Sequence, residues 1–262
     1  MSKKILVTGA TDGIGLETAR MLVQEGHHVL LHGRNPDKLN NIQKELSAIG
    51  TVESHIADLS NIQSVILLSE KIKEKHEFLD VLINNAGVFK TQNPITQDGL
   101  DVRFVVNTIS PYLLTKKLLP LLGKSSRVIN LSSAAQAPVS LNAMRGDEHL
   151  SDSSAYAQSK LAITMWSREM ALTLKDKGPV IIAVNPGSLL GSKMVKEAYG
   201  ISGGDIKKGA SILVRTSLED EFSNATGLYF DNDSGQLASP HPDALDLHKI
   251  LELKNTLEEM LS

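Results

Sequence analysis

Apolar residues along this chain fall into two alternating patterns: short unbroken runs, and longer segments in which they recur every three or four positions. Strands that are apolar throughout and separated by helices are typical of a parallel sheet covered on both faces. We interpret seven runs as strands: Ile5 to Thr8, Val29 to His32, Val52 to Ala57, Val81 to Asn84, Val128 to Leu131, Val180 to Asn185 and a weaker one at Leu228 to Phe230. The pattern predicts one α/β domain over residues 1–262, doubly wound around a seven-stranded parallel sheet with helices on both faces.

Composition agrees with a single domain. The 262 residues are 41% hydrophobic, which is enough to bury one large core, and no repeat or linker divides them. The net charge of -3 gives no electrostatic reason to expect nucleic acid as a partner. The N-terminus enters the first strand without the apolar segment of a signal peptide, and no apolar run reaches the length of a membrane span. We therefore expect a cytoplasmic protein without a membrane partner.

Metal chemistry has little support in the sequence. The chain has no cysteine, which excludes disulfides, a thiol nucleophile and a thiolate metal site. The eight histidines are scattered, and none is paired at i,i+4 with a nearby set of acidic ligands. We predict no catalytic metal.

A glycine-rich loop, Thr8 to Gly15, stands between the first strand and a segment of helical periodicity. Glycines allow the backbone to turn tightly and to approach a diphosphate, which the N–H groups at the start of the next helix can bind. A tight turn without a ligand is the alternative. The candidate cofactor contacts in this loop are Gly9, Thr11, Asp12, Gly13, Ile14 and Gly15.

The ends of the second and third strands bear on which dinucleotide is bound. An acid at the end of the second strand would bind the ribose 2′-hydroxyl of NAD, but Gly33 stands at that point. Arg34 follows it, and a guanidinium there suits the 2′-phosphate of NADP instead. A solvated arginine is the alternative, and Asp12 adds no second positive charge. Asp58 and Leu59 are placed to reach the adenine, unless Asp58 caps the helix that starts near Asn61. We predict NADP (NADPH) as the cofactor.

Amide and hydroxyl side chains follow the fourth and fifth strands. In Asn84-Asn85-Ala86-Gly87, the last three residues are candidate nucleotide contacts, although the motif can equally join neighbouring strand ends. The fifth strand ends in Ser132 and Ser133, and either hydroxyl could hold a substrate oxygen or belong to an ordinary turn. Both strand ends are expected at the same edge of the sheet.

The segment Gly99 to Leu122 is predicted to form one long helix that contains Asn107 and, four residues later, Pro111. Proline has no N–H, so the Asn107 carbonyl is freed and the helix bends there. A freed carbonyl can hold an ordered water, whereas a simple packing kink is the alternative.

Tyr156 and Lys160 lie one turn apart at the start of the next predicted helix, for which Ser153 or Ser154 is a suitable N-cap. An ammonium beside a phenol favours the phenolate and lowers the tyrosine pKa from its usual value of about 10. Tyr156 could then exchange a proton with an alcohol or carbonyl oxygen near neutral pH. Taken alone, such a pair more often forms a solvated helix face.

The last third of the chain offers segments that could cover a substrate. The irregular stretch Ala134 to Ser154 is expected to lie over the site entrance. Pro186, Gly187 and Ser188 follow the sixth strand and are candidate cofactor contacts, and the glycine-rich residues from about 188 to 210 are predicted to form a lid. The segment Asp243 to Leu261 is predicted to form an amphipathic helix for the core or a subunit contact. Its apolar positions are Leu245, Ile250, Leu253, Leu257 and Met260.

In their order and near their spacing, these motifs resemble those of the short-chain dehydrogenase/reductase family. They are Thr8-Gly9-x3-Gly13-Ile14-Gly15, Asn84-Asn85-Ala86-Gly87, Asn107, Ser133, Tyr156-x3-Lys160 and Pro186-Gly187. The resemblance runs from about Lys3 to Phe230 and implies a Rossmann fold and an oxidoreductase. Gly33-Arg34-Asn35-Pro36 and the long insert before Tyr156 are most similar to the retinol-dehydrogenase and WW-domain-oxidoreductase-like branch.

The resemblance also implies a catalytic tetrad of Asn107, Ser133, Tyr156 and Lys160. Tyr156 would be the general acid in reduction and the base in oxidation, and Ser133 would hold the substrate oxygen. Lys160 would bind the nicotinamide ribose and depress the tyrosine pKa. The backbone carbonyl of Asn107 would hold a water that leads from Lys160 to solvent.

In one respect the chain departs from the family. The usual threonine after Pro186-Gly187, which contacts the nicotinamide carboxamide, is not plainly present, and Ser192 stands nearby instead. By analogy with the family, a homo-oligomer is expected, a dimer or tetramer built on the helices of Asn107 and Tyr156.

Three functions follow as hypotheses. The first is an NADP-dependent oxidoreductase that moves a hydride between the nicotinamide and a small-molecule carbonyl or secondary alcohol. The second is a catalytically silent nucleotide sensor or scaffold on the same fold, and the third is a reductase of a carbon–carbon double bond. The complete tetrad favours the first.

Overall fold

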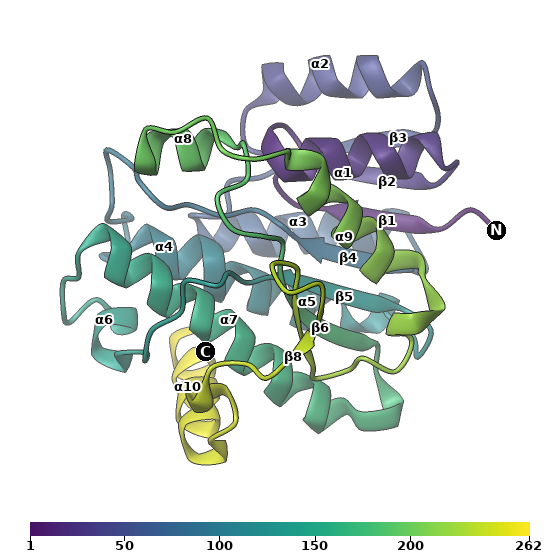
Figure 1. Cartoon of the computed structure of the whole chain (residues 1–262). Coiled ribbons are helices and arrows are strands. Elements are labelled where there is room, and N and C mark those ends of the chain that lie inside the picture. Colours follow the sequence, from purple (N-terminus) through teal and green to yellow (C-terminus); the bar gives the residue numbers. More distant parts are fainter.

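A single sheet divides the molecule into two helical layers (Figure 1). The computed structural model describes the backbone of residues 1–262 and every side chain except those of Asp176, Lys193, Ala198 and Tyr199. The strands are β1 Lys4–Val7, β2 His28–Gly33, β3 Val52–Ile56, β4 Val81–Asn84, β5 Arg127–Leu131, β6 Val180–Asn185, β7 Tyr229–Asp231 and β8 Gln236–Ala238. Their order in the sheet is β3-β2-β1-β4-β5-β6-β7-β8. The order reverses between β1 and β4, which is where doubly wound sheets bind ligands, beyond the carboxyl ends of the strands.

The prediction of seven parallel strands is right for β1 to β7, but the sheet has eight strands. β8 pairs with β7 in the antiparallel direction, with Tyr229 opposite Ala238. Its three residues carry no apolar run and are largely exposed, so the hydrophobic pattern could not reveal it. β8 is an edge strand made by a hairpin, and its pairing covers one side of β7.

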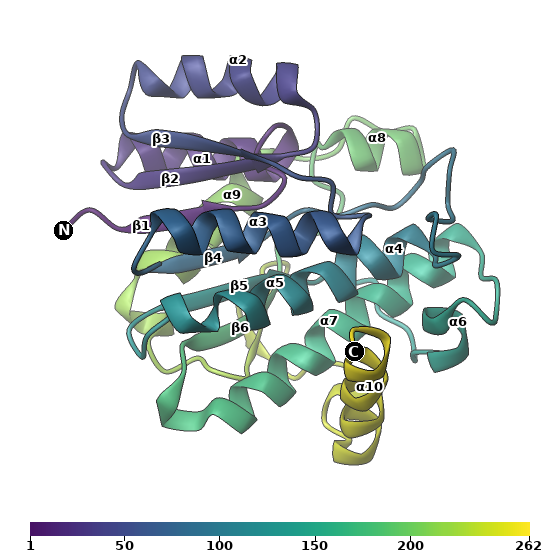
Figure 2. The same ribbon diagram turned by 180° about the vertical axis from the view of Figure 1, so that it is seen from behind.

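Successive side chains of each strand point to opposite faces of the sheet, and both faces are apolar, so helices cover both. Ile5 and Val7 of β1 belong to one apolar core and Leu6 to the other. The helices α1 Gly13–Gln24, α2 Pro36–Ser47 and α9 Ile206–Leu218 lie on one face. The helices α3 Ile62–Lys75, α5 Ser110–Leu118 and α7 Asp152–Leu174 lie on the other, with α10 Leu247–Met260 packed outside α7 (Figure 2). The buried layers hold the strand ends, and so the candidate site, in a fixed arrangement.

The predicted long helix over Gly99 to Leu122 is not continuous. It consists of α4 Val102–Phe104, a π-helical turn Val105–Ile109, α5 and a 3-10 turn Leu119–Leu121. The Ser110 N–H bonds the Val105 carbonyl, five residues back, just before Pro111, which has no N–H to donate. Asn107 therefore lies in a π-turn, a distortion that is frequent at functional sites.

The insert before Tyr156 is more ordered than predicted. It contains α6 Leu141–Arg145, which Ser140 caps at its start and Gly146 ends in the left-handed conformation, φ 89°. Ala143 and Met144 are buried in the main core. The N-cap of α7 is Ser151 rather than Ser153 or Ser154, because its hydroxyl accepts the Ser154 N–H.

The C-terminal helix begins later than predicted. Asp246 caps α10, and a 3-10 turn Pro242–Ala244 precedes it, so Leu245 lies outside the helix and is 48% exposed. Ile250, Leu253 and Leu257 are buried as expected. On α5, the Tyr112 hydroxyl and the Lys116 ammonium both bond Glu258 of α10. The C-terminal helix is thus held against α5 and α7 by apolar packing and by charge.

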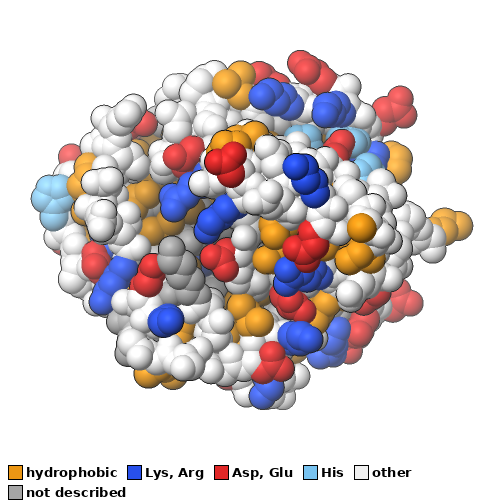
Figure 3. All heavy atoms as spheres, turned by 90° about the horizontal axis from the view of Figure 1, so that it is seen from above, with side chains coloured by type: hydrophobic (Ala, Val, Ile, Leu, Met, Phe, Trp, Pro, Cys, Tyr) orange, Lys and Arg blue, Asp and Glu red, His pale blue; other side chains and the backbone are white. Residues whose placement is uncertain are grey.

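Charged side chains of both signs are interspersed on the face shown in Figure 3. In the described part of the chain, no helix combines the length and the apolar character that crossing a membrane would require.

Candidate active site

The glycine-rich loop turns directly beneath the strand ends at the crevice between β1 and β4. Gly9 has φ +67°, and a Cβ there would lie 3.0 Å from Ala86 Cα. A Cβ on Gly15 would lie only 2.3 Å from both the Gly9 carbonyl oxygen and Asn85 Nδ2. Side chains are therefore excluded at both positions, and the bare backbone is what a diphosphate needs in order to reach the start of α1.

Asp12 is the N-cap of α1, and its exposed carboxylate accepts the Gly13 N–H at 2.8 Å. Thr11 packs beneath Gly33 at the end of β2, where an added Cβ would lie 2.5 Å from Thr11 Cγ2. Ile14 faces α9, 3.2 Å from the place of a Cβ on Gly209. Of the predicted loop contacts, Thr11 and Ile14 therefore also serve packing, and Asp12 also serves helix capping.

Asn85 holds the loop in place rather than projecting freely into the crevice. Its side-chain amide donates to the carbonyls of Thr8 at 2.9 Å and Gly9 at 3.2 Å. The N–H groups of Asn85 and Ala86 in turn donate to the Thr8 hydroxyl. For Asn85, the structure therefore shows the structural alternative for this motif, the joining of neighbouring strand ends.

Gly87 lies at the centre of the candidate site. A Cβ on this residue would lie 3.5 Å from Asn107 Oδ1, 3.6 Å from Lys160 Nζ and 3.7 Å from the Met194 methyl group. These neighbours come from the π-turn, from α7 and from α8 Lys193–Tyr199, within the segment predicted to form a lid. The glycine keeps open a space between three elements that are far apart in sequence.

His32, which was not identified from the sequence, holds the glycine loop in place through hydrogen bonds. Its Nδ1 accepts the Gly9 N–H at 3.2 Å, and its Nε2 lies 3.1 Å from the Ala57 carbonyl, to which it donates. Complete burial lowers the pKa of His32 to about 4, so the ring is neutral at pH 7. A histidine at the end of an otherwise apolar strand was the sequence feature that could have revealed it.

Arg34 is exposed just beyond β2, and the described residues give it no ion-pair partner. Asp58 is also exposed, and its carboxylate accepts the N–H and the hydroxyl of Ser60. The N-cap of α3 is Asn61, so Asp58 caps no helix. Leu59 is buried, and its carbonyl accepts the Ser110 hydroxyl at 2.6 Å.

Tyr156 and Lys160 lie one turn apart near the start of α7. The Lys160 ammonium is 5.7 Å from the centroid of the Tyr156 ring, and it donates to the Leu131 carbonyl at the end of β5 at 2.7 Å. Phe89 packs edge-on against the tyrosine ring, with 4.8 Å between centroids. Lys160 is only 4% exposed, and burial lowers the pKa of its ammonium to about 8. The group remains mainly protonated at pH 7, but it is held in a place that disfavours its charge.

The two hydroxyls at the end of β5 have different environments. Ser132 is buried and bonds the Lys160 carbonyl and the Thr164 hydroxyl, so it is committed to α7. Ser133 is half-buried, its hydroxyl accepts the Ala135 N–H, and the Tyr229 hydroxyl donates to its carbonyl. Ser133 is therefore the hydroxyl that remains accessible to a ligand.

Asn107 is buried and links the π-turn to its surroundings. Its side chain accepts the Val88 N–H at 2.8 Å and donates to the Val88 carbonyl and the Ser159 hydroxyl, both at 2.9 Å. These bonds fix the segment just after Gly87 against the middle of the Tyr156–Lys160 turn.

The turn after β6 is held by the β7–β8 hairpin. Ser188 donates through its N–H and its hydroxyl to the Asp233 carboxylate, and Asn232 donates to the Pro186 carbonyl. The hydrogen bonds of Ser188 lower the pKa of Asp233 although burial opposes this. Gly187 adopts φ +118°. Ser188 thus has a structural partner, and Ser192, which stands near the place of the family's threonine, caps α8.

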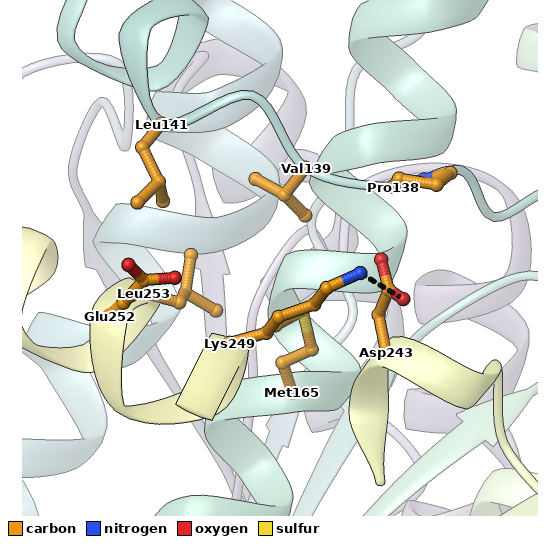
Figure 4. A pocket seen from close by; sticks show the side chains of 8 residues that line it. All are labelled: Pro138, Val139, Leu141, Met165, Asp243, Lys249, Glu252 and Leu253. Carbon is orange, nitrogen blue, oxygen red and sulfur yellow. Dashed lines mark hydrogen bonds and ion pairs between the residues drawn. The ribbon is translucent and has the colours of Figure 1, made fainter. Parts of the chain in front are cut away.

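A separate cavity of about 160 Å³ lies away from these residues (Figure 4). Its walls include Val139 of the insert, Met165 of α7 and Leu253 of α10, and an ion pair of 2.7 Å between Lys249 and Asp243 stands beside it. No member of the tetrad lines it. The insert predicted to lie over the site entrance therefore packs partly against α10.

The arrangement fits a dinucleotide on two counts. The glycine loop forms a cradle that a Cβ at Gly15 would fill, and the start of α1 supplies N–H groups behind it. The Leu131 carbonyl is the acceptor that the described residues give Lys160, which leaves further ammonium donors for a ribose. A phenol beside a buried cation can transfer a proton to an oxygen placed above it.

Comparison with known proteins agrees with this geometry. The family model described as short chain dehydrogenase matches residues 3–200. Human retinol dehydrogenase 13 is 31% identical over 267 residues, covering 93% of this chain and 80% of that protein. Mouse retinol dehydrogenase 12 is 32% identical over 247 residues, covering 88% and 78% respectively.

Among solved structures, the Pseudomonas aeruginosa RhlG/NADP active-site complex is 25% identical, with a TM-score of 0.73 over 89% of this chain and 95% of that one. An uncharacterised protein from Mycobacterium paratuberculosis, also 25% identical, has a TM-score of 0.82 over 98% and 92%. The chain is thus similar in sequence to named retinol dehydrogenases and in fold to a structure solved with NADP.

Proposed function

Because the chain belongs to the short-chain dehydrogenase/reductase family, in the retinol-dehydrogenase-like branch, we propose that it is an NADP-dependent oxidoreductase acting on a small-molecule carbonyl or secondary alcohol. Family membership establishes the fold and the oxidoreductase class. The cofactor, the acting residues and the kind of substrate are the content of the proposal.

One observation carries the proposal: a buried ammonium is fixed 5.7 Å from the ring of a tyrosine one turn away. The cation favours the phenolate of Tyr156 and so brings its proton within reach of neutral-pH chemistry. The Leu131 carbonyl and the surrounding burial fix the lysine, and Phe89 restrains the tyrosine ring. Proton transfer then needs no large movement of either side chain.

In reduction, bound NADPH supplies the hydride. Tyr156 gives its proton to the carbonyl oxygen, Ser133 donates a hydrogen bond to the same oxygen, and Lys160 orients the ribose. Asn107 keeps the Gly87–Val88 segment and the Tyr156 turn in register through its bonds to Val88 and Ser159. In oxidation, Tyr156 takes the proton back from the alcohol.

The choice of NADP rests on Arg34, which is exposed and unpaired among the described residues beyond β2. The solved neighbours determined with NADP support this choice. We expect Arg34→Ala to raise KM for NADPH about 10- to 100-fold, because a charge-assisted contact of about 1.5–3 kcal/mol is lost, and to leave KM for NADH nearly unchanged. Lys38→Ala, which removes a positive charge from the first turn of α2, is the matched control.

The acid–base role is tested by Tyr156→Phe. Steady-state rates with NADPH and a panel of aldehydes, ketones, enones and quinones should fall about 10²- to 10⁴-fold, while fluorescence titration shows NADPH binding nearly intact. Unchanged turnover in this variant would refute the mechanism. Tight NADPH binding by the wild type without oxidation on any substrate would instead favour a silent nucleotide-binding protein, and activity confined to enones would favour reduction of a double bond.

A further inference from the structure

A cluster of ligand-type side chains lies far from the tetrad, where β3 meets the end of α3. Glu53 and His55 stand two residues apart on β3 and so share one face of the strand, and His76 is the C-cap of α3. Glu53 Oε1 lies 3.0 Å from His55 Nε2 and also contacts His76 Nε2. Two imidazole nitrogens from different elements therefore converge on one carboxylate oxygen.

The position of this cluster separates it from the proposed chemistry. Glu53 is the second residue of β3, and α3 runs back to the edge of the sheet at which the strands begin. The glycine loop and Tyr156 belong to the opposite edge, where the strands end. Figure 2 shows the start of β3 and the end of α3 on the side of the molecule where the N-terminus lies.

The donor atoms lie close enough together for one metal ion to bind all three. The three candidate ligand atoms all lie within 4.8 Å of one another, and among the described residues this is the one such group. Zinc bonds to imidazole nitrogen and carboxylate oxygen of about 2.0–2.2 Å would bring the three atoms to about 3.3–3.5 Å from one another in a tetrahedron. Both imidazole nitrogens lie closer to the Glu53 oxygen than that, so the side chains would move slightly apart to admit the ion.

We propose that Glu53, His55 and His76 bind one divalent transition-metal ion, with Zn²⁺ as the natural candidate, and that this ion ties the edge strand β3 to the end of α3. Two imidazoles and one carboxylate are a ligand set that zinc uses with water as the fourth ligand. His55 and His76 are buried, whereas Glu53 keeps 24% of its side chain exposed, so the ion and its water enter from the Glu53 side.

The types of ligand in the cluster select the kind of ion. Glu53 is the one carboxylate among the three ligands, and the other two are imidazoles. Ca²⁺ and Mg²⁺ depend on several oxygen ligands, which this cluster does not provide, whereas Zn²⁺, Co²⁺ and Ni²⁺ bind imidazole well.

The ring of His28 supports the geometry. It packs edge-on against His76, with 6.1 Å between centroids and an interplanar angle of 73°. This contact limits the rotation of the His76 ring, which is the ligand that comes from outside β3. The ligand from α3 is thus restrained before an ion arrives.

The test uses the full chain, stripped with a chelator and titrated with Co²⁺, whose visible absorption reports both stoichiometry and coordination, followed by displacement with Zn²⁺. We expect one equivalent per chain and a rise in melting temperature on Zn²⁺ addition. Glu53→Gln keeps the shape and a hydrogen-bond acceptor but removes the charge, and His76→Asn removes one ligand; each should weaken binding at least about tenfold. Far-UV circular dichroism identifies any variant that fails to fold, and Glu53→Gln carries the test in that case.

The exposed pair His248 and Glu252 on α10, 3.3 Å apart, provides the matched control, because it offers only two donors. His248→Gln should bind Co²⁺ as the wild type does. Absence of Co²⁺ absorption at excess metal, or binding that is unchanged in both Glu53→Gln and His76→Asn, would overturn the proposal and leave the cluster as a hydrogen-bonded clamp.

Discussion

Arg103 and Lys160 are both buried cations, 2% and 4% exposed, the first packed against the start of α7 and the second part of α7, yet their surroundings are opposite. The Arg103 guanidinium bonds both carboxylate oxygens of Asp101 at 2.8 and 2.6 Å, and it also contacts Asp152 in the first turn of α7. Although burial opposes it, these two carboxylates raise the pKa of Arg103. Lys160 has a carbonyl for its partner, and burial lowers its pKa to about 8.

The difference separates a structural charge, that of Arg103, from the charge that we propose acts in the reaction, that of Lys160. The Arg103 cluster is satisfied, so it fixes α4 to the start of α7 and, through the Phe89 carbonyl at 3.4 Å, the segment beside Tyr156. Lys160 is held in a place that its charge disfavours, and a group of that kind gains stabilisation when an anionic or hydroxyl-bearing ligand arrives. Arg103 thus stabilises the structure around the candidate site, whereas we propose that Lys160 binds a ligand.

Replacing Lys160 should have the largest effect on activity. We expect Lys160→Met to lower kcat/KM about 10²- to 10⁴-fold, because the tyrosine loses the charge that favours its phenolate. The same change should raise the free energy of unfolding at pH 7, by up to about 3 kcal/mol, since the ammonium is disfavoured in the fold.

The pH dependence of that stability gives the check. A folded pKa near 8, below the usual 10.5, means that the contribution of Lys160 to stability is fully present above about pH 10.5 and is lost as the pH falls through 8. Urea unfolding of the wild type and of Lys160→Met should therefore converge at high pH. A variant that is less stable than the wild type at pH 7 would contradict this account of Lys160.

Disrupting the ion pairs of Arg103 should mainly lower the stability of the fold. Arg103→Met leaves Asp101 without its buried counter-charge, and we expect a loss of about 3–5 kcal/mol in the free energy of unfolding, measured by urea denaturation. Arg215→Met is the control, because Arg215 is 43% exposed and its ion pairs with Glu219 and Glu221 should contribute less than about 1 kcal/mol. Equal losses in the two variants would show that the Arg103 cluster is no more than a surface network.

How much of the structure could be predicted from the sequence depends on how far apart in the chain the interacting residues are. Most of the strands β1 to β7 were predictable because they are largely apolar, although β3 contains Glu53, Ser54 and His55. The glycine loop and the Tyr156–Lys160 turn were predictable because they are short motifs. The Arg103 cluster joins residues 49 positions apart, and the Glu53–His76 contact spans 23. No local pattern encodes such pairs, because it is the packing of α7 on α4, or of α3 on β3, that brings them together.

The misread segments have equally physical causes. Pro111 predicted a bend near Asn107, but the helical periodicity of Gly99 to Leu122 gave no indication that the distortion is a π-turn, because the pattern of apolar residues is nearly the same in a distorted helix. Between Ala134 and Ser154, α6 is only five residues long, too short for periodicity to show, and it depends on the burial of Ala143 and Met144. Local propensity fails where tertiary contacts decide the conformation.

His32 sharpens the comparison as a third buried base, one that is neutral rather than charged. Its folded pKa near 4, below the usual 6.5, means that its contribution to stability is fully present above about pH 6.5 and is lost as the pH falls through 4. The charged ring would also lose the acceptor that holds the Gly9 N–H.

We expect His32→Gln, whose amide can donate and accept but does not titrate, to flatten the fall in unfolding free energy between pH 6.5 and 4, by up to about 3 kcal/mol. Urea unfolding at several pH values measures this, with the 81% exposed His248→Gln as control. An acid profile that is identical in His32→Gln and the wild type would mean that the glycine loop does not depend on the uncharged ring.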